Sequence, residues 1–309
     1  LGSAPASAKL APMRPRDLIE LLLLSLLWGG AFLFTRAAVP EFGPAPLVAL
    51  RLGIGALLVL PVVAWRGKLA QMAQRPRQML VLGLAFTALP FWLLSWSALH
   101  IGAGLLAVLN ATAPMFAGIV GHFVFRERLG RTRAAGLAIG FAGVALLVSG
   151  GNLALKTGDG ALALAAVLLA AAAWGIGGNY ARRRLGSVDP MVTTVVSLAA
   201  ASLALAPLAW TTWPAQPPSL RAWAEIVFLG VASSGLGMLM YFRLLNRIGA
   251  VRAISVTFLN PVVAIVGGAL YLGEAITPAV VGGTAVVLFG TALSLGLIGP
   301  ARAAPAGSA

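Results

Sequence analysis

The chain has 309 residues, of which 60% are hydrophobic and only 10% are charged, and its mean hydropathy is +0.94. Soluble domains carry about 25% charged residues, so this composition excludes an ordinary water-soluble domain. A net charge of +14 would suggest nucleic-acid binding in a soluble protein, but here the basic residues lie between long apolar runs. The chain has no cysteine, which excludes disulfides, a thiol nucleophile and a cysteine metal site.

Apolar runs of about 20 residues, the length that crosses a bilayer core, follow one another along the chain. Backbone polar groups have no water partner in lipid, so each run must be a helix or part of a closed barrel. The runs are too long and too continuous for barrel strands, which alternate and cross in about 10 residues. We therefore predict an all-α integral membrane protein with ten transmembrane helices, at residues 17–37, 44–65, 78–99, 102–125, 133–150, 160–181, 190–211, 221–243, 251–272 and 278–298.

The basic residues are distributed unevenly between the two sides of this predicted bundle. With the N-terminus placed in the cytoplasm, eighteen of the 22 Lys and Arg residues fall on the cytoplasmic side. The other four are Arg36, Arg51, Lys156 and Arg221. Such an excess is the positive-inside signal, so both termini are predicted to be cytoplasmic and the basic charge sets the orientation. Contact with anionic lipid is a secondary role for the same residues.

One stretch of the sequence occurs twice. "HIGAGLLAVLNATAP", which ends at Pro114, is followed 147 residues later by "RIGAVRAISVTFLNP", which ends at Pro261. Each copy belongs to a unit of five spans, an odd number, so the second unit must cross the membrane in the opposite direction. Inverted repeats of this kind are typical of secondary transporters, whose substrate site lies between the halves near the midplane. Duplication also occurs in membrane scaffolds and channels, and that alternative remains.

The repeat extends to other residue types. The same offset of 147 relates Glu127 to Glu274, and the glycine pair at 136 and 143 to the pair at 283 and 290. "LLWGGAFLFTRA" and "AAWGIGGNYARR" place Trp28 and Trp174 at an offset of 146. A proline inside a helix frees a carbonyl and allows a bend. Because Pro114 and Pro261 recur in register, we predict that they act as hinges.

These motifs resemble the EamA-type transporters of the drug/metabolite transporter superfamily, most of all bacterial exporters of aromatic and other neutral amino acids. The resemblance rests on the Trp-Gly pair of each half, the pattern AL…IGA…P…E at 98–127 and 245–274, and the closing glycine-rich helix. It implies two inverted five-helix repeats around a central cavity, in a multi-pass protein of the bacterial inner membrane. The expected organisation is an N-terminal tail at 1–16, repeats at 17–150 and 160–298, an extracytoplasmic linker at 151–159 and a C-terminal tail at 299–309.

The predicted spans are poor in charge and carry aromatic, amide and hydroxyl side chains near their middles. Rings attract an ammonium group, and amides and hydroxyls supply both hydrogen-bond donors and acceptors. A cavity of this kind suits a zwitterion with an apolar side chain. The predicted substrate-binding residues are Trp28, Phe32, Phe91, Trp92, Trp96, Asn110, Trp174, Asn179, Ser234, Tyr241, Ser255, Thr257 and Asn260.

Arg51 is the one basic residue well inside a predicted span, about 10 Å from the start of its helix at 1.5 Å per residue. Three roles are open for it. It contacts a substrate carboxylate, it makes a structural hydrogen bond, or its long side chain reaches the outer interface.

All eight acidic residues fall at predicted span ends or in loops, so no mid-span carboxylate is expected to carry a proton or a sodium ion. Acid–base catalysis lacks its usual pair, and two histidines make no metal cluster. We expect no enzymatic activity, no cofactor and no metal. The expected partners are a small-molecule substrate and membrane lipid, not nucleic acid, and we expect a monomer.

The leading hypothesis is an exporter of amino acids or related small metabolites that works by alternating access. A carrier of sugar phosphates or nucleotide sugars needs several intramembrane cations, and Arg51 is nearly alone. A multidrug exporter for cations needs a buried acid. A membrane scaffold without transport is the remaining alternative.

Overall fold

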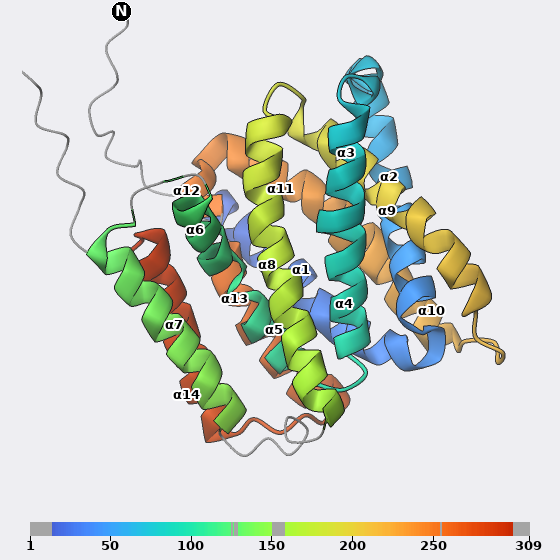
Figure 1. The fold of residues 1–309 in the computed structure, drawn as a ribbon. Coiled ribbons are helices and arrows are strands. Elements are labelled where there is room, and N and C mark those ends of the chain that lie inside the picture. The colour runs from blue at the N-terminus through green and yellow to red at the C-terminus, as the bar shows by residue number, and fades with distance from the viewer. Residues whose placement is uncertain (1–13, 125, 127–128, 150–157, 254, 299–309) are drawn as a thin grey trace, which may run out of the picture.

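The computed structural model describes residues 14–124, 126, 129–149, 158–253 and 255–298, which are helical and contain no strand. Nine helical segments of this part of the chain are at least 18 residues long and apolar enough to cross a membrane, and Val256–Leu272 is a shorter apolar helix. Together they form the predicted ten-helix membrane fold (Figure 1). The whole C-terminal tail, most of the N-terminal tail, most of the 151–159 linker and Glu127 lie outside the described residues.

The first half of the chain makes five crossings. Proline occupies the first position of α1, α2 and α3, where its missing N–H has no helical partner in any case. Gly43, with a φ of 76°, turns the chain directly from the first crossing into the second. The helices are α1 (Pro15–Phe42), α2 (Pro44–Trp65), a 3-10 helix (Leu69–Ala73), α3 (Pro76–Gly83), α4 (Leu89–Ser97), α5 (Ala103–Asn110), α6 (Ala113–Phe123) and α7 (Arg131–Ser149).

The second half makes the other five crossings. Three of its helices begin at residues whose side chains accept a backbone N–H of the first turn: Asp189, Ser219 and Thr277. Such caps satisfy donors that would otherwise have no partner. The helices are α8 (Gly158–Arg184), α9 (Pro190–Thr211), α10 (Leu220–Val227), α11 (Gly237–Ile248), α12 (Ala250–Ala253), α13 (Val256–Leu272) and α14 (Pro278–Leu295).

A π-helical stretch interrupts the third crossing of each half. Leu84–Ala88 joins α3 to α4, and Phe228–Leu236 joins α10 to α11. The two stretches are related by the repeat, since Thr87 plus 147 is Ser234. A π-helical turn changes the regular pattern of backbone hydrogen bonds of the α-helix. In the first stretch, the hydroxyl of Thr87 donates to the carbonyl of Leu82, 3.1 Å away. Such turns are frequent at functional sites, so both stretches draw attention to the middle of the third crossings.

The two halves pack through glycine. A Cβ on Gly290 of α14 would overlap with the backbone nitrogen of Gly140 of α7, so the two backbones touch directly. The repeated glycines Gly136 and Gly143 also lie in this contact. In lipid, such small residues allow helices to approach closely without a hydrophobic driving force. The first crossing of each half packs on the fourth crossing of the other half: α1 contacts α13, and α8 contacts α6.

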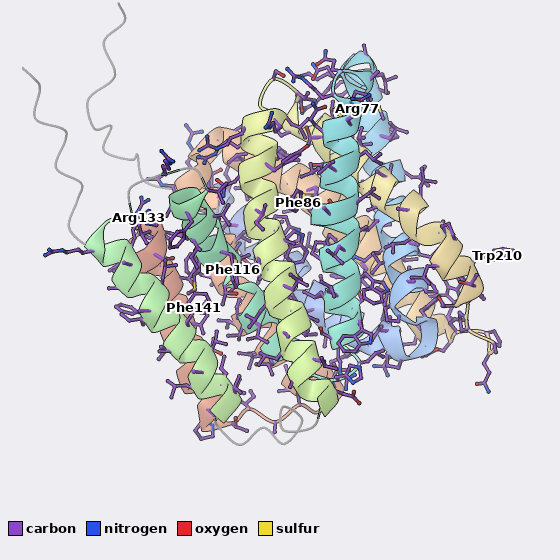
Figure 2. The ribbon with its side chains drawn as sticks, viewed as in Figure 1. Arg77, Phe86, Phe116, Arg133, Phe141 and Trp210 are labelled. Carbon is purple, nitrogen blue, oxygen red and sulfur yellow. The ribbon has the colours of Figure 1, made fainter. Side chains whose placement is uncertain are left out.

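The two ends of the bundle differ in charge. Arginines lie at the start of α3 and α7 and at the end of α8, and Figure 2 shows Arg77 and Arg133 at the same end of the molecule. We call this end the basic end. The opposite end, which holds the end of α4, the start of α5 and the turn from α13 to α14, is called the far end. The charge distribution predicts that the basic end is cytoplasmic.

Candidate functional site

Two connected hollows lie between the halves. The central cavity has a volume of about 420 Å³ and the vestibule about 520 Å³, both within the range of small-molecule sites. The vestibule extends toward the basic end, where it is lined by Arg133, Arg182 and the end of α14. No acidic side chain lines either hollow among the described residues. The walls that the two hollows share are Asn110, Trp174, Gly178, Thr257 and Asn260.

The repeat sets the walls of the central cavity. On α1 the lining residues follow the spacing of one helical face, and α8 presents the same face 146 residues later. On the third crossings and their π-helical stretches the same holds at an offset of 147. The matched sets are Trp28, Ala31, Phe32 and Thr35 with Trp174, Gly177, Gly178 and Ala181, and Phe86, Thr87 and Phe91 with Ser233, Ser234 and Met238.

The matched positions carry different chemistry. Phe32, Phe86 and Phe91 of the first half correspond to glycine, serine and methionine in the second. The first half therefore supplies a rigid aromatic wall, while the second half leaves room. The two walls of the cavity therefore differ in shape and in chemistry.

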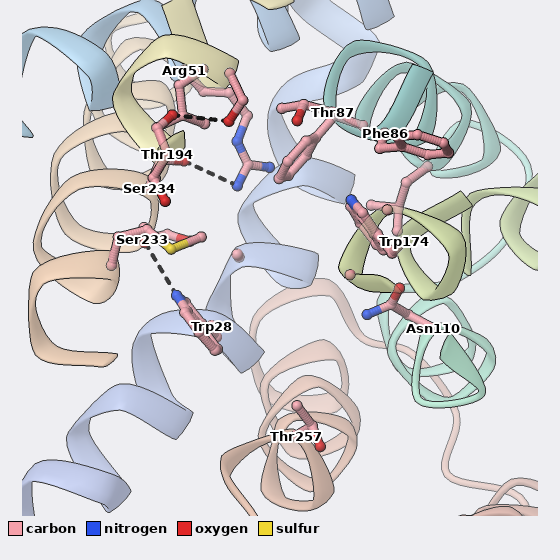
Figure 3. A pocket seen from close by; sticks show the side chains of 18 of the residues that line it. Trp28, Arg51, Phe86, Thr87, Asn110, Trp174, Thr194, Ser233, Ser234 and Thr257 are labelled. Atoms are coloured by element: carbon pink, nitrogen blue, oxygen red, sulfur yellow. Dashed lines mark hydrogen bonds between the residues drawn. The ribbon is translucent and has the colours of Figure 1, made fainter. Parts of the chain in front are cut away.

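Arg51 of α2 is the one charged residue among those that line the central cavity, and it is only 3% exposed. Its guanidinium donates to Thr35 at 3.2 Å, makes a long 3.5 Å contact with Ser234, and lies 4.7 Å from the ring centre of Phe91. Its Nε has no hydrogen-bond partner among the described residues. Figure 3 shows the guanidinium at the hollow, so Arg51 does not reach the outer interface. The burial of its side chain therefore excludes the role in which Arg51 extends to the outer interface.

Most of the predicted substrate residues meet around these hollows. The rings of Trp28 and Trp174 border the same space in Figure 3, and the indole N–H of Trp28 donates to the carbonyl of Ser233 at 3.2 Å. Trp174 contacts Phe91 edge to face across the two halves, with ring centres 5.2 Å apart. The predicted residues that line the central cavity are Trp28, Phe32, Phe91, Asn110, Trp174, Ser234, Thr257 and Asn260, and Asn179 lines the vestibule.

Trp92 and Trp96, predicted as substrate residues, lie outside both hollows. Phe91 faces the cavity, and each further residue turns the helix by about 100°, so Trp92 and Trp96 face another way. Trp92 packs against a small cluster that contains Ala45 of α2 and Ala209 of α9, and Trp96 lies 4.7 Å from His100.

Tyr241 and Ser255 are also outside the hollows. Tyr241 lies behind Trp28, with ring centres 5.2 Å apart, in an apolar cluster with Leu21 and Leu244. The hydroxyl of Ser255 donates to the backbone carbonyl of Arg252 at 2.6 Å, between α12 and α13, where the backbone needs a partner.

Several lining residues were missed by sequence reasoning, among them Thr35, Phe86, Thr87, Ser197 and Ser233. The repeat offset could have found them. Ser234 was predicted, and subtracting 147 leads to Thr87, while adding 146 to Arg51 leads to Ser197. Arg51 is therefore matched by a small hydroxyl residue in the second half, and the charge of the cavity belongs to the first half alone.

The two predicted hinge prolines differ in structure. Pro114 lies at the start of α6, just after a break at Ala111–Thr112 that separates it from α5. Pro261 lies inside α13, which continues through it from Val256 to Leu272. The two prolines therefore occupy different positions in their helices, and their role as hinges stays a prediction. The chain breaks next to Pro114, whereas in the second half α12 ends at Ala253, well before Pro261.

Two buried amide oxygens face these hollows. Asn110 ends α5 at the break, and Asn260 lies on α13; both line the central cavity and the vestibule. Their Oδ1 atoms are buried and accept no hydrogen bond from any described residue. Because an unsatisfied buried acceptor costs free energy, these two oxygens are suited to accept a hydrogen bond from a ligand.

The vestibule is basic, and an amide connects its helices. The side-chain amide of Asn179 donates to the carbonyls of Ala117 at 3.2 Å and Gly175 at 3.1 Å, which links α8 to α6. Its oxygen accepts from Arg182 at 2.9 Å. Asn179 therefore orients a guanidinium at the mouth of the vestibule. Arg133 of α7 lies on the other wall.

Two segments of the sequence, residues 18–149 and 161–296, match the EamA-like transporter family. The chain belongs to this family. As an EamA-like transporter it is a multi-pass membrane protein, and the segment matches cover both halves of the repeat.

Two relatives and one solved structure extend this result. The chain is 26% identical to the uncharacterized inner membrane transporter YedA of Escherichia coli strain K12, over 86% of this chain and 87% of that protein. It is 28% identical to a probable terminal-alkyne amino-acid exporter of Streptantibioticus cattleyicolor, over 85% and 88%. A crystal structure with 19% identity matches with a TM-score of 0.66 and covers 92% of this chain and 97% of that chain, which shows the fold.

Proposed function

We propose that this EamA-like transporter exports amino acids with aromatic or other apolar side chains, or closely related small metabolites, from the cytoplasm by alternating access. Arg51 carries the proposal. A guanidinium buried in a cavity without acids needs an anionic partner, and its fork of N–H donors matches a carboxylate. Its unpartnered Nε is one donor available for this contact.

The rest of an amino acid also finds matching groups. The free Oδ1 atoms of Asn110 and Asn260 accept hydrogen bonds from an ammonium group, and the faces of Trp28 and Trp174 attract the same charge. The aromatic wall of Phe32, Phe86 and Phe91 suits an apolar side chain. The amino-acid exporter among the relatives supports this substrate class.

The other hypotheses fit the cavity less well. A phosphate ester carries about two negative charges, and the central cavity offers one guanidinium among its described residues. A cationic drug favours a carboxylate, and none lines the described walls. A scaffold without transport leaves the unpartnered Nε of Arg51 unexplained.

We further propose that the protein acts as a monomer in the bacterial inner membrane, with membrane lipid around it and the basic end in the cytoplasm. The wide vestibule at that end suits entry of substrate from the cytoplasm. The inner-membrane relative supports this location. No nucleic acid, cofactor or metal is part of the proposal.

The test is uptake and counterflow in vesicles that contain the purified protein. Labelled aromatic, aliphatic, acidic and basic amino acids would be compared with a sugar phosphate and a cationic dye. We expect aromatic and aliphatic amino acids to move. Movement of only the sugar phosphate or only the dye, or of nothing at all, would reject the proposal.

Arg51→Gln sharpens the same test. Loss of a buried, charge-assisted contact with the carboxylate should lower kcat/KM by about 100-fold. Arg51→Lys keeps the charge but loses the planar fork and should recover part of this loss. Arg77→Gln, at the basic end and outside both hollows, is the matched control and should transport normally. Normal kcat/KM in Arg51→Gln would remove Arg51 from the substrate site.

A further inference from the structure

The turn between α13 and α14 holds a carboxylate that bonds to the other half of the molecule. Glu274 accepts the backbone N–H of Ala103 through Oε1 at 2.8 Å and that of Gly104 through Oε2 at 3.3 Å. Ala103 and Gly104 are the first residues of α5, where backbone N–H groups have no helical partner. An ionised carboxylate is favoured at such a helix start. Glu274 therefore ties the second half to the first at the far end.

Two glycines make room for this carboxylate. A Cβ on Gly102 would lie 2.8 Å from Oε2 of Glu274, and a Cβ on Gly268 would lie 2.6 Å from the same atom. The backbone N–H of Glu274 donates to the carbonyl of Gly268 at 3.0 Å, and Gly273, with a φ of 69°, turns the chain back toward α13. Glycine at these positions has a specific use, because any side chain at 102 or 268 would push the carboxylate away.

The tie lies beside the contact between α5 and α13 at the far end. A Cβ on Gly104 would lie 3.3 Å from Cα of Ile265, so the two helices touch where Glu274 holds the start of α5. Both helices also line the central cavity, at Asn110 and at Thr257 and Asn260, on the vestibule side of this contact. Separation of α5 from α13 would open a route from the cavity to the far end. Such a separation breaks the bonds of Glu274.

Glu274 is accessible to protons. It is half-buried and lines two far-end hollows of about 340 and 380 Å³. The charged and titratable groups of these hollows are Arg36 and Glu41 of α1, His100 before α5, and Arg221 and Glu225 of α10. Arg36 donates to the carbonyl of Ala98 at 2.6 Å, and Arg221 contacts Glu225 and Tyr271. Among the described residues, Glu274 is therefore the one acid of this group whose hydrogen bonds join α5 to the second half.

We propose that Glu274 is a gating residue. A proton that arrives from the far side of the membrane controls the gate by binding to its carboxylate. Ionised, it holds α5 against α13 and keeps the far end closed. When a proton binds the carboxylate, the charge-assisted bonds to Ala103 and Gly104 weaken and the far end opens. The step makes and breaks no covalent bond other than that to the proton. It rests on the proposed transporter function but not on the identity of the substrate.

The natural absence of cysteine makes the test clean, since one introduced cysteine is the only thiol. Leu94→Cys places it in the wall of the central cavity. Labelling by a membrane-impermeant maleimide added from the far side then reports opening. We expect labelling to increase as the far-side solution is acidified. In the Glu274→Gln background, labelling should be about fivefold faster at neutral pH and nearly independent of pH.

Glu41→Gln is the matched control, because Glu41 also ties the halves at the far end through Ser219, but not at α5. It should keep the pH dependence of the parent. If Glu274→Gln does not fold, Gly102→Ala displaces the carboxylate and should raise labelling at every pH. Equal labelling and an unchanged pH profile in the Glu274 or Gly102 variant, or loss of the profile in Glu41→Gln, would overturn the proposal.

Failure of the substrate proposal would look different. Labelling needs no substrate, so a pH-dependent and Glu274-dependent signal in a protein that moves no amino acid would preserve the gate and reject only the cargo. Amino-acid flux in a protein whose labelling does not depend on Glu274 would support the substrate proposal and reject the gate.

Discussion

Two glycines of the fourth crossing, Gly104 and Gly118, differ in how closely described atoms of other helices approach them. At the far end Gly104 of α5 touches Ile265 of α13, where a Cβ would lie 2.8 Å from Cγ1 of that isoleucine. Under the repeat offset of 147, this pair corresponds to residue 251 and Gly118. Gly118 lines the vestibule, and a Cβ there would meet no described atom within 4 Å.

Under the proposed alternating-access mechanism, this difference corresponds to one of two states. The halves are related by an inverted repeat, so a conformation in which they exchange roles closes the contact at Gly118 and opens the one at Gly104. Under that mechanism, the structure is the state whose vestibule faces the basic end. Small residues at both positions allow each contact to close in turn.

The largest expected effect comes from Gly118→Leu. The added side chain fits the open vestibule of the present state but overlaps with the opposite helix when that contact closes. Such an overlap costs about 1–3 kcal/mol or more, so transport should fall by about 100-fold while Tm stays near that of the parent. Flux in vesicles and thermal unfolding of the purified protein measure the two quantities.

Gly282→Leu is the control for this substitution, since Gly282 is an exposed glycine of α14 with no described atom near its Cβ position. It should transport normally. Normal flux in Gly118→Leu would mean that the contact at Gly118 never closes, and the exchange of roles between the halves would be wrong.

The matched tryptophans offer a second comparison. Trp28 donates to Ser233 and packs against Tyr241, whereas Trp174 lines both hollows. Trp174→Ala should therefore lower kcat/KM by about tenfold with little change in Tm, because it removes a cavity wall. Trp28→Ala should lower Tm as well, because it leaves a void and an unpaired carbonyl.

Trp210→Ala, at an 85% exposed tryptophan of α9, is the control for both variants and should change neither kcat/KM nor Tm. In Figure 2 its side chain lies at the outer edge of the bundle. Unfolding of Trp174→Ala, or unchanged flux in it, would assign Trp174 to packing alone.

The smallest expected effect concerns the tie between the halves at the basic end. Lys68 donates to Asp189, the first-turn cap of α9, outside both hollows. Burial alone would raise the pKa of the Asp189 carboxyl, but the bonds from Lys68 and from the Met191 N–H lower it more. The stability that this carboxylate contributes is present above its unfolded pKa and is lost as pH falls through the lowered folded pKa.

Asp189→Asn should therefore lower Tm by about 1–2 °C at neutral pH, with the difference vanishing in strong acid, and should leave flux unchanged. Thermal scans of the two proteins across pH measure this difference. A large loss of transport would show that the basic end has a tie as important for gating as the one at Glu274.

Much of this organisation could be predicted from the sequence, and particular residues show where prediction stopped. Trp28 and Trp174 were predicted to line the cavity because they recur beside glycines. Trp92 was predicted with them, but Phe91 occupies the inward face of α4. Hydropathy cannot separate these neighbours, since a helix in lipid is apolar on its inner and outer faces alike.

Phe86 and Ser233 were missed for another reason. They lie in π-helical stretches, where the usual 3.6-residue spacing does not hold and the face of a residue cannot be counted from its neighbours. Arg51 shows a third limit. Its side chain is long enough to reach the interface or to turn inward, and only contacts with Thr35 and Phe91 decide between them.

The sequence by itself determined that the chain lies in lipid, that it makes ten apolar crossings and that its two halves are inverted repeats. The lengths of the apolar runs and the residue offsets are enough for this, because they are properties of the chain alone. The tertiary structure decided which face of each helix borders the hollow, where the fourth crossing breaks, and that Glu274 bonds to α5. These depend on contacts between residues more than a hundred positions apart, which no local pattern encodes.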